Sequence, residues 1–292
     1  MRTSERTPSL AHESVAPLGA HLDVQKMPAH WLMARLGKRV LRPGGIETTR
    51  WLLEHAAVGP QDDVIEFAPG LGRTAALVLS KRPKSYNGVE RDARAAQFAE
   101  QALGRVGFRD ARVLLGDAAS VPLPDASATL VVGEAMLSMQ TASTKQAIMN
   151  EAYRLLQPGG RYVIHELAVT PDSLDSAELA RIQADLSATI HVGVRIGTVR
   201  DWRQWLEGAG FAIEQVTTAP MALLEPARLI RDEGVAGAAR FLFNALRTRG
   251  AARRLRAVRR VFHTHQQHLC AVGMIARRAE PTSLGAADRP LA

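Results

Sequence analysis

The sequence has a single cysteine, Cys270, among its 292 residues. One cysteine cannot form a disulfide within the chain, and it cannot supply a cysteine-based metal cluster. The chain also lacks a run of 18 apolar residues, so no transmembrane helix is expected. The first twenty residues have no apolar segment of the kind found in secretory signals. These absences predict a cytoplasmic protein without a bound metal.

Acidic residues are scarce in the segment 224–280, and aromatic residues make up only 5% of the whole chain. Residues 224–280 hold twelve arginines, no lysine and four acidic residues, which gives this segment alone a charge of +8. The whole chain also has a net charge of +8, so the remainder is near neutral. Any attraction to acidic partners is therefore expected in that segment.

Short aliphatic runs alternate with helical patterns along most of the chain, which predicts βαβ units on a parallel sheet. Strands are expected at 63–67, 86–90, 112–115, 128–133, 161–167, 211–217 and 269–276, and helices at about 21–36, 46–57, 72–81, 92–104, 142–156 and 199–208. The last two strands are separated by about 50 residues, where helices are expected at 223–233, 237–249 and 251–266.

The expected fold is therefore α/β, a Rossmann-like, mostly parallel sheet of seven strands with helices on both faces. An N-terminal helical lid and a helical insertion between the last two strands complete it. By region, we expect disordered tails at 1–20 and 280–292, the lid at 21–59, the core at 60–220 with 267–279, and a basic insertion at 221–266 that covers the substrate side.

A glycine loop follows the first predicted strand, in the sequence VIEFAPGLGRT from Val64 to Thr74. Glycines let a ligand approach the backbone, and the helix that follows presents free N–H groups. The spacing Gly70-x-Gly72-x-x-Ala75 also fits a dinucleotide fingerprint, with Glu90 placed to bind a ribose. The loop alone therefore leaves a nicotinamide enzyme open.

Its neighbours favour a different cofactor. Glu66 precedes the glycines, where a carboxylate suits an ammonium group better than a pyrophosphate, and Asp117 ends the third predicted strand. A Pro158-Gly159-Gly160 turn joins a helix to the fifth strand. Together these motifs resemble the class I S-adenosylmethionine-dependent methyltransferases, in particular their UbiE-like small-molecule branch, over about residues 60–217 plus the closing strand.

The resemblance implies the roles of particular residues. The first acid and the glycines would hold the methionine end of S-adenosylmethionine, Glu90 the ribose hydroxyls, and Asp117 with Ala118 the adenine. The segment after the fourth strand, 133–137, would line the cofactor and face the substrate. The implied cofactor-binding set is Glu66, Ala68, Gly70, Gly72, Thr74, Glu90, Arg91, Asp117, Ala118, Glu134 and Met136.

Two features depart from the family pattern. Ala68 occupies the place of the first loop glycine, and Pro69 removes an N–H donor from the loop. The segment after the fourth strand also lacks the (Asp/Asn)-Pro-Pro-(Tyr/Phe) pattern of enzymes that methylate the exocyclic amines of bases. Nucleic acid is therefore disfavoured as the acceptor.

Catalytic residues are poorly marked, because methyl transfer depends mainly on alignment, and a base is needed only when the nucleophile arrives protonated. His165, His191 and Glu134 are the candidates, with His21 and His30 on the predicted lid. Each histidine is at least as readily an ordinary surface or hydrogen-bonded residue. No single base is assigned.

The basic insertion has three interpretations. In the first, residues 251–266 form a solvated helix that packs on the domain. In the second, they attract an acidic or lipophilic substrate, or a membrane surface. In the third, they bind RNA. RNA is disfavoured because aromatic side chains for stacking are scarce there. Peripheral membrane contact through 237–266 and a homodimer both remain open.

The sequence as a whole predicts transfer of a methyl group to a small, apolar or aromatic acceptor, with oxygen favoured as the accepting atom. The alternatives are an NAD(P)-dependent oxidoreductase on the same fold and an RNA-binding or RNA-modifying methyltransferase relative.

Overall fold

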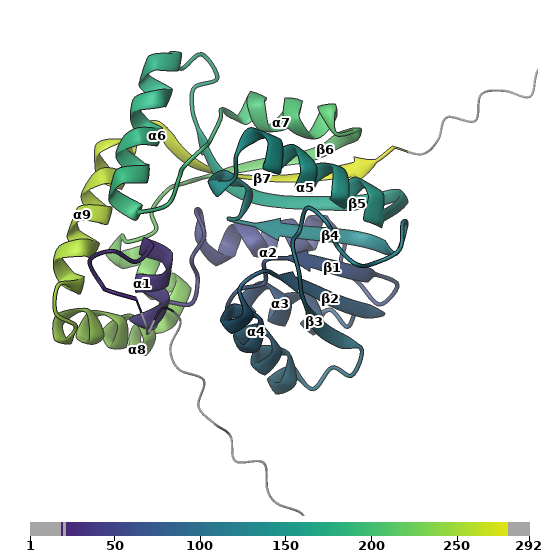
Figure 1. The fold of residues 1–292 in the computed structure, drawn as a ribbon, viewed down its shortest axis with the longest axis horizontal. Coiled ribbons are helices and arrows are strands. Elements are labelled where there is room, and N and C mark those ends of the chain that lie inside the picture. Colours follow the sequence, from purple (N-terminus) through teal and green to yellow (C-terminus); the bar gives the residue numbers. More distant parts are fainter. Residues whose placement is uncertain (1–18, 20–21, 280–292) are drawn as a thin grey trace, which may run out of the picture.

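Seven strands form one sheet in the computed structural model, which describes Gly19 and residues 22–279. Their order is β3-β2-β1-β4-β5-β7-β6, and β7 runs antiparallel to both of its neighbours while the other pairs are parallel (Figure 1). The strands are β1 Asp63–Phe67, β2 Ser85–Glu90, β3 Ala111–Leu115, β4 Ala128–Glu134, β5 Leu156–Val169, β6 Phe211–Pro220 and β7 Leu269–Arg278. The predicted α/β fold with a mostly parallel sheet is confirmed.

Helices cover both faces of the sheet, so the inner strands are apolar on both sides. One face packs against α2 Gly45–His55, α3 Arg73–Ser80 and α4 Ala93–Val106, and the other against α5 Ala142–Leu155 and α7 Val199–Gly208. In β1, Val64 packs on the face covered by α2, α3 and α4, and Ile65 packs on the face covered by α5 and α7. Both side chains are almost completely buried. This alternation explains why the continuous run DVIEF is a strand.

The remaining helices gather beyond the carboxyl ends of the parallel strands (Figure 1). We call them the cover: α1 Ala29–Arg35, α6 Ser176–Ile190, α8 Pro226–Arg247 and α9 Ala251–Thr264. Helices α1, α8 and α9 share an apolar cluster of their own, which includes Leu32, Phe241 and Val258. The helices α8 and α9 lie between β6 and β7, as expected for the insertion.

The N-terminal helix differs from the expectation, and one helix was not expected. The N-terminal helix begins at Ala29 rather than at 21, because Pro28 precedes it and disfavours helical geometry in the residue before it. Residue His21 and both predicted tails, apart from Gly19, lie outside the described residues. The two helices expected at 223–233 and 237–249 are the two parts of α8, which are separated by the non-helical Gly234, at φ 74° and ψ 166°.

The helix that the sequence did not predict is α6. Asp175 caps its first turn through the N–H groups of Ala177 and Glu178, but only Ile182 and Leu186 are fully buried along its fifteen residues. So narrow an apolar stripe gives little periodic signal.

Buried charges fasten the segment 36–44 to α8. The Glu233 carboxylate accepts hydrogen bonds from the backbone N–H groups of Arg39 and Val40, at 2.7 and 2.8 Å, and from the Arg39 guanidinium. Lys38 Nζ lies 3.4 Å from Asp232 Oδ2 in the same buried group. The segment that leads from α1 to α2 is thus fixed by side chains far along the chain.

The helices of the described part of the chain include none that is both long and apolar enough to cross a membrane.

Because the cover has its own apolar cluster, we predict that Phe241→Ala loosens the cover before the sheet. Loss of a buried phenylalanine costs about 3–5 kcal/mol. Hydrogen exchange should therefore accelerate in α1, α8 and α9 while the amides of β1 and β4 remain protected. Phe243→Ala, two residues away and 56% exposed, is the matched control and should change neither. Equal acceleration in cover and sheet would show that they open as one unit.

Candidate functional site

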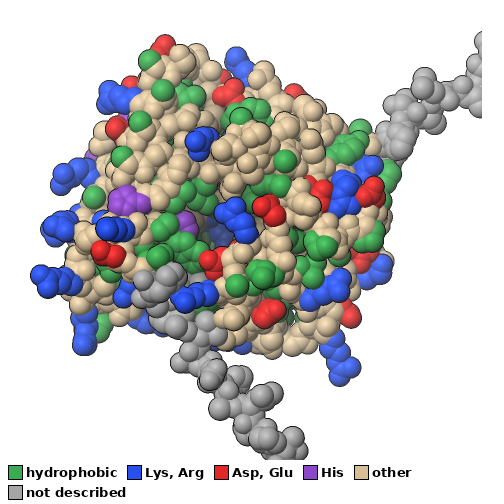
Figure 2. Space-filling model, viewed as in Figure 1, with side chains coloured by type: hydrophobic (Ala, Val, Ile, Leu, Met, Phe, Trp, Pro, Cys, Tyr) green, Lys and Arg blue, Asp and Glu red, His purple; other side chains and the backbone are tan. Residues whose placement is uncertain are grey.

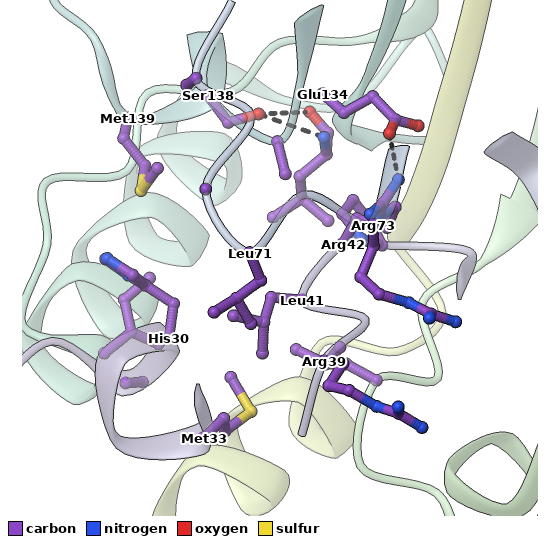
Figure 3. Close-up of a pocket in the computed structure, with 18 of the residues that line it drawn as sticks. His30, Met33, Arg39, Leu41, Arg42, Leu71, Arg73, Glu134, Ser138 and Met139 are labelled. Atoms are coloured by element: carbon purple, nitrogen blue, oxygen red, sulfur yellow. Dashed lines mark hydrogen bonds and ion pairs between the residues drawn. The ribbon is translucent and has the colours of Figure 1, made fainter. Parts of the chain in front are cut away.

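A cavity of about 220 Å³ lies between the carboxyl edge of the sheet and the cover. The loop after β1 and the start of α3 form its floor, and the end of β4 forms one wall. Apolar side chains from α1 and α9 and from the segments that follow α6 and β6 form much of the rest. They include Met33, Val194, Met221, Leu223, Val258 and Phe262. Figure 3 shows His30, Met33 and Leu41 grouped on the side of the cavity opposite Glu134.

The loop after β1 is held in an unusual backbone conformation. Ala68, Gly70 and Gly72 all have positive φ angles, of 53°, 53° and 68°. A Cβ atom at Gly72 would collide with Ala102 of α4, so only glycine lets the loop pack this closely. Ala68 adopts the left-handed region despite its side chain, a strain typical of ligand sites, and its N–H donates to Val89 O at 2.8 Å. The predicted departure at Ala68 therefore keeps the glycine-like conformation.

Glu134, at the end of β4, is the centre of a buried polar cluster. Its carboxylate is ion-paired with Arg42 and accepts hydrogen bonds from Thr49 and Thr74. His165 Nδ1 lies 2.9 Å from Glu134 Oε1, and since a carboxylate only accepts, this nitrogen carries the proton. Figure 3 shows the contact between Arg42 and Glu134.

This cluster decides the charge on Glu134. Burial by itself would raise the pKa of its carboxyl, but the Arg42 charge and the His165 hydrogen bond lower that pKa to about 2. A carboxylate with so low a pKa is a poor proton acceptor at neutral pH. Glu134 lines the cavity, and its chemistry suits the orientation of other groups better than general-base catalysis.

Glu66 behaves in the opposite way. It also lines the cavity, and burial raises its pKa to about 8, although a 2.7 Å hydrogen bond from Tyr86 Oη opposes the shift. A cationic group bound beside Glu66 would favour its ionised form. The site therefore holds a carboxyl group that can change its charge when a cation arrives.

Several other predicted cofactor residues lie outside the cavity. Glu90 ends β2, is 7% exposed, and accepts hydrogen bonds from Gly70 N and Asp92 N at 3.1 and 3.0 Å. Asp117 is exposed after β3 and accepts from Ala119 N at 2.9 Å. Arg91 is exposed, and Ala118 is buried in the core cluster beneath α5. These residues lie at and after the ends of β2 and β3, beside the loop and outside the cavity.

Glu166 positions the segment after β4, including Met136. It is fully buried and accepts hydrogen bonds from the backbone N–H groups of Met136, Leu137 and Ser138, at 2.7–3.0 Å, and from Ser138 Oγ. Met136 itself does not line the cavity, whereas Ala135, at φ 52°, and Ser138 do. A buried carboxylate therefore holds this wall in place.

The predicted histidines fall in different environments. His165 is completely buried, and its Nε2 has no partner within the described residues, whereas His191 is exposed at the end of α6 and contacts Arg254. Neither lines the cavity. His30 of α1 does, and burial lowers the pKa of its imidazole to about 4, which keeps it neutral at pH 7.

Three arginines also line the cavity, and sequence reasoning assigned them no role. Arg42 neutralises Glu134, and Arg39 pairs with Glu233. Arg73, the first residue of α3, has no acidic partner among the described residues, and its Nε is buried without a hydrogen bond. Burial and the nearby Arg39 charge lower its pKa. An anionic group in the cavity would satisfy this unpaired cation.

Comparison with known proteins finds a family match in the central region of the chain. Residues 65–164 match the family model described as "Methyltransferase domain". An uncharacterized protein of Haemophilus influenzae is 28% identical over 249 residues, which cover 83% of this chain and 96% of that protein. An arsenite methyltransferase of Halobacterium salinarum is 26% identical over 167 residues, 56% of this chain and 40% of that protein.

Solved structures share the fold at low identity. The [4+2]-cyclase SpnF matches with a TM-score of 0.67 and 16% identity over 87% of this chain and 97% of that chain. Others with the same fold were solved with SAM or S-adenosylhomocysteine bound. Because a cyclase shares the fold, the fold alone does not fix the reaction. The sequence match to a methyltransferase family carries that assignment.

The raised pKa of Glu66 gives a prediction for stability. Its folded value of about 8 lies above the unfolded value of about 4.5, so the native state retains a proton that the unfolded state releases. The free energy of unfolding should therefore fall as pH rises from about 4.5 to about 8. Glu66→Gln should remove this part of the slope in urea unfolding measured across that range. Parallel pH profiles for the two proteins would contradict the assignment.

Proposed function

From the premise that this chain carries a class I S-adenosylmethionine-dependent methyltransferase domain, we propose that it methylates a small, apolar or aromatic acceptor that bears an acidic oxygen. The observation that carries the proposal is the cavity, whose floor is the glycine loop and whose opposite wall is the apolar inner surface of the cover. Such a cavity brings a cofactor loop and an acceptor pocket into one space.

The residues present fit S-adenosylmethionine. Its methionine end carries an ammonium and a carboxylate, and the cavity offers the Glu66 carboxyl on one side and the unpaired Arg73 guanidinium on another. Glu90 and Asp117, at the ends of β2 and β3, would take the ribose and adenine. When bound, the cofactor would supply a methyl group attached to a sulfonium. Loss of that methyl group would leave a neutral thioether.

The protein's own contribution is alignment and exclusion of water. Glu166 fixes the wall after β4 and the Glu134 cluster fixes Arg42 and α3, so the floor of the cavity is rigid. Val258 and Phe262 close the opposite side with apolar surface. Holding an acceptor oxygen in line with the methyl carbon can contribute roughly 7–11 kcal/mol in favourable cases. A carbon–oxygen bond forms as the carbon–sulfur bond breaks.

The proton balance favours an acidic acceptor. If the oxygen arrives as a hydroxyl, its proton must pass to a base, and His30 is the neutral imidazole in the cavity. A base with a pKa of about 4 removes a proton only weakly at pH 7. A phenol or carboxylic acid, which ionises more readily than an alcohol, therefore fits this site better.

The nicotinamide alternative fits less well. A pyrophosphate needs free N–H donors on the glycine loop, but Pro69 has none and Gly70 N donates to Glu90. Glu90, whose carboxyl group accepts the Gly70 N–H, would also place an acidic side chain beside the phosphates.

The two cofactors can be separated by thermal unfolding, because a ligand of the native state raises its stability. S-adenosylmethionine and S-adenosylhomocysteine should raise Tm, and NAD(P)H should not. Transfer of a labelled methyl group to a panel of phenols, carboxylic acids, alcohols and amines then tests the acceptor. Stabilisation by NAD(P)H alone would contradict the proposed methyltransferase activity. Methyl transfer only to amines would contradict the proposed oxygen acceptor.

Arg73→Gln should weaken S-adenosylmethionine and S-adenosylhomocysteine alike, by about 10- to 100-fold in Kd, since a charged hydrogen bond contributes roughly 1.5–3 kcal/mol. Titration calorimetry measures both. Arg203→Gln, an exposed arginine on α7 on the other face of the sheet, is the control and should bind as the unmodified chain does. Unchanged cofactor affinity with a raised KM for the acceptor would reassign Arg73 to the acceptor.

A further inference from the structure

The outer face of α8 exposes large apolar side chains. Val235, Leu242, Phe243 and Leu246 are 73%, 55%, 56% and 79% exposed. The described residues include seven exposed large hydrophobic side chains, and five of them, these four and Ile230, lie on this one helix. Such a concentration marks a surface that meets another apolar phase.

The exposed residues after Gly234 share one face of the helix. Residues 235, 239, 242 and 246 follow helical spacing, and Phe243 lies beside them. The opposite face carries Ala238, Phe241 and Ala245, which pack in the apolar cluster with α1 and α9. Because the inner face is already covered by α1 and α9, the outer stripe is not needed for folding of the cover.

Unpaired positive charge lies on the same helix and on the neighbouring α9. Helices α8 and α9 and the turn between them contain only two acidic residues, Asp232 and Glu233, and both are buried against Lys38 and Arg39. Six exposed arginines on these helices and the turn form no ion pair with an acidic side chain in the described part of the chain: Arg240, Arg247, Arg249, Arg253, Arg256 and Arg260. Figure 2 shows lysine and arginine side chains gathered along the edge of the molecule that α8 and α9 form.

We propose that this outer surface of α8, together with the arginines around it, docks on an anionic lipid bilayer. A helix that exposes aliphatic and phenyl side chains between arginines matches the boundary of acyl chains and charged headgroups. Each arginine near an anionic membrane surface adds attraction, and the apolar stripe adds burial. This surface lies on the outside of the cover, so membrane binding can be tested independently of the chemistry in the cavity.

Other occupants fit the surface less well. A second copy bound through the same face would bring two sets of unpaired arginines together, because a two-fold contact repeats one patch on both subunits. Single-stranded nucleic acid needs aromatic rings for stacking, and Phe243 is the one exposed ring among the apolar residues of this face. Aliphatic side chains beside arginines suit lipid.

The test is co-sedimentation of the full-length chain with vesicles of phosphatidylcholine, with and without phosphatidylglycerol. We expect binding to the anionic vesicles that weakens with salt. Leu242→Glu/Leu246→Glu should weaken it by more than about tenfold, and Arg240→Gln/Arg247→Gln by about fivefold per arginine. Val106→Glu and Arg105→Gln, at the end of α4, are matched controls and should bind as the unmodified chain does.

Thermal unfolding of each variant verifies that the surface changes leave the fold intact. Three results would overturn the proposal. They are no sedimentation with anionic vesicles at low salt, unaltered binding by Leu242→Glu/Leu246→Glu, and equal binding to vesicles without phosphatidylglycerol. A chain that is dimeric, binds no vesicles and becomes monomeric in Leu242→Glu/Leu246→Glu would also overturn it, and would assign the surface to a second copy.

Discussion

The ion pair between Arg42 and Glu134 ties together the parts that build the cavity. Its members come from the segment before α2 and from β4, and the same carboxylate also binds Thr49 of α2, Thr74 of α3 and His165 of β5. Removing one partner of such a buried pair leaves an uncompensated charge, at a cost of about 3–5 kcal/mol. The glycine loop with α3, the wall at the end of β4 and the segment that leads to the cover are therefore coupled through the Glu134 side chain.

Charge is divided between the walls of the cavity. The Glu66 carboxyl group lies near the end of β1, while Arg73 and Arg39 lie at the start of α3 and on the segment from α1. A zwitterionic ligand can interact with both sides, because its cationic group favours the ionised form of Glu66. The strained Ala68 and Ala135 lie on the floor and wall between them. Strain and separated charge thus coincide at the place where the cofactor and acceptor would meet.

The sheet was predictable because its strands are buried on both faces and read as short continuous apolar runs, as in DVIEF at 63–67. The glycine loop and Glu66 were predictable for a local reason, since strand, loop and helix are adjacent in sequence. Arg42 and Arg73 were not, because their roles depend on contacts with Glu134 and with the cavity that no spacing encodes. The apolar neighbours of Arg42, Val40 and Leu41, were the one local signal of its burial.

The cover and the sheet keep separate apolar interiors, and the seam between them includes the buried group of Lys38, Asp232 and Glu233. The family match spans 65–164 and includes neither the segment before α2 nor α8 and α9. Substitutions within the apolar cluster of the cover can therefore reshape the wall of the cavity that Val258 and Phe262 form, while the core beneath the glycine loop keeps its own packing.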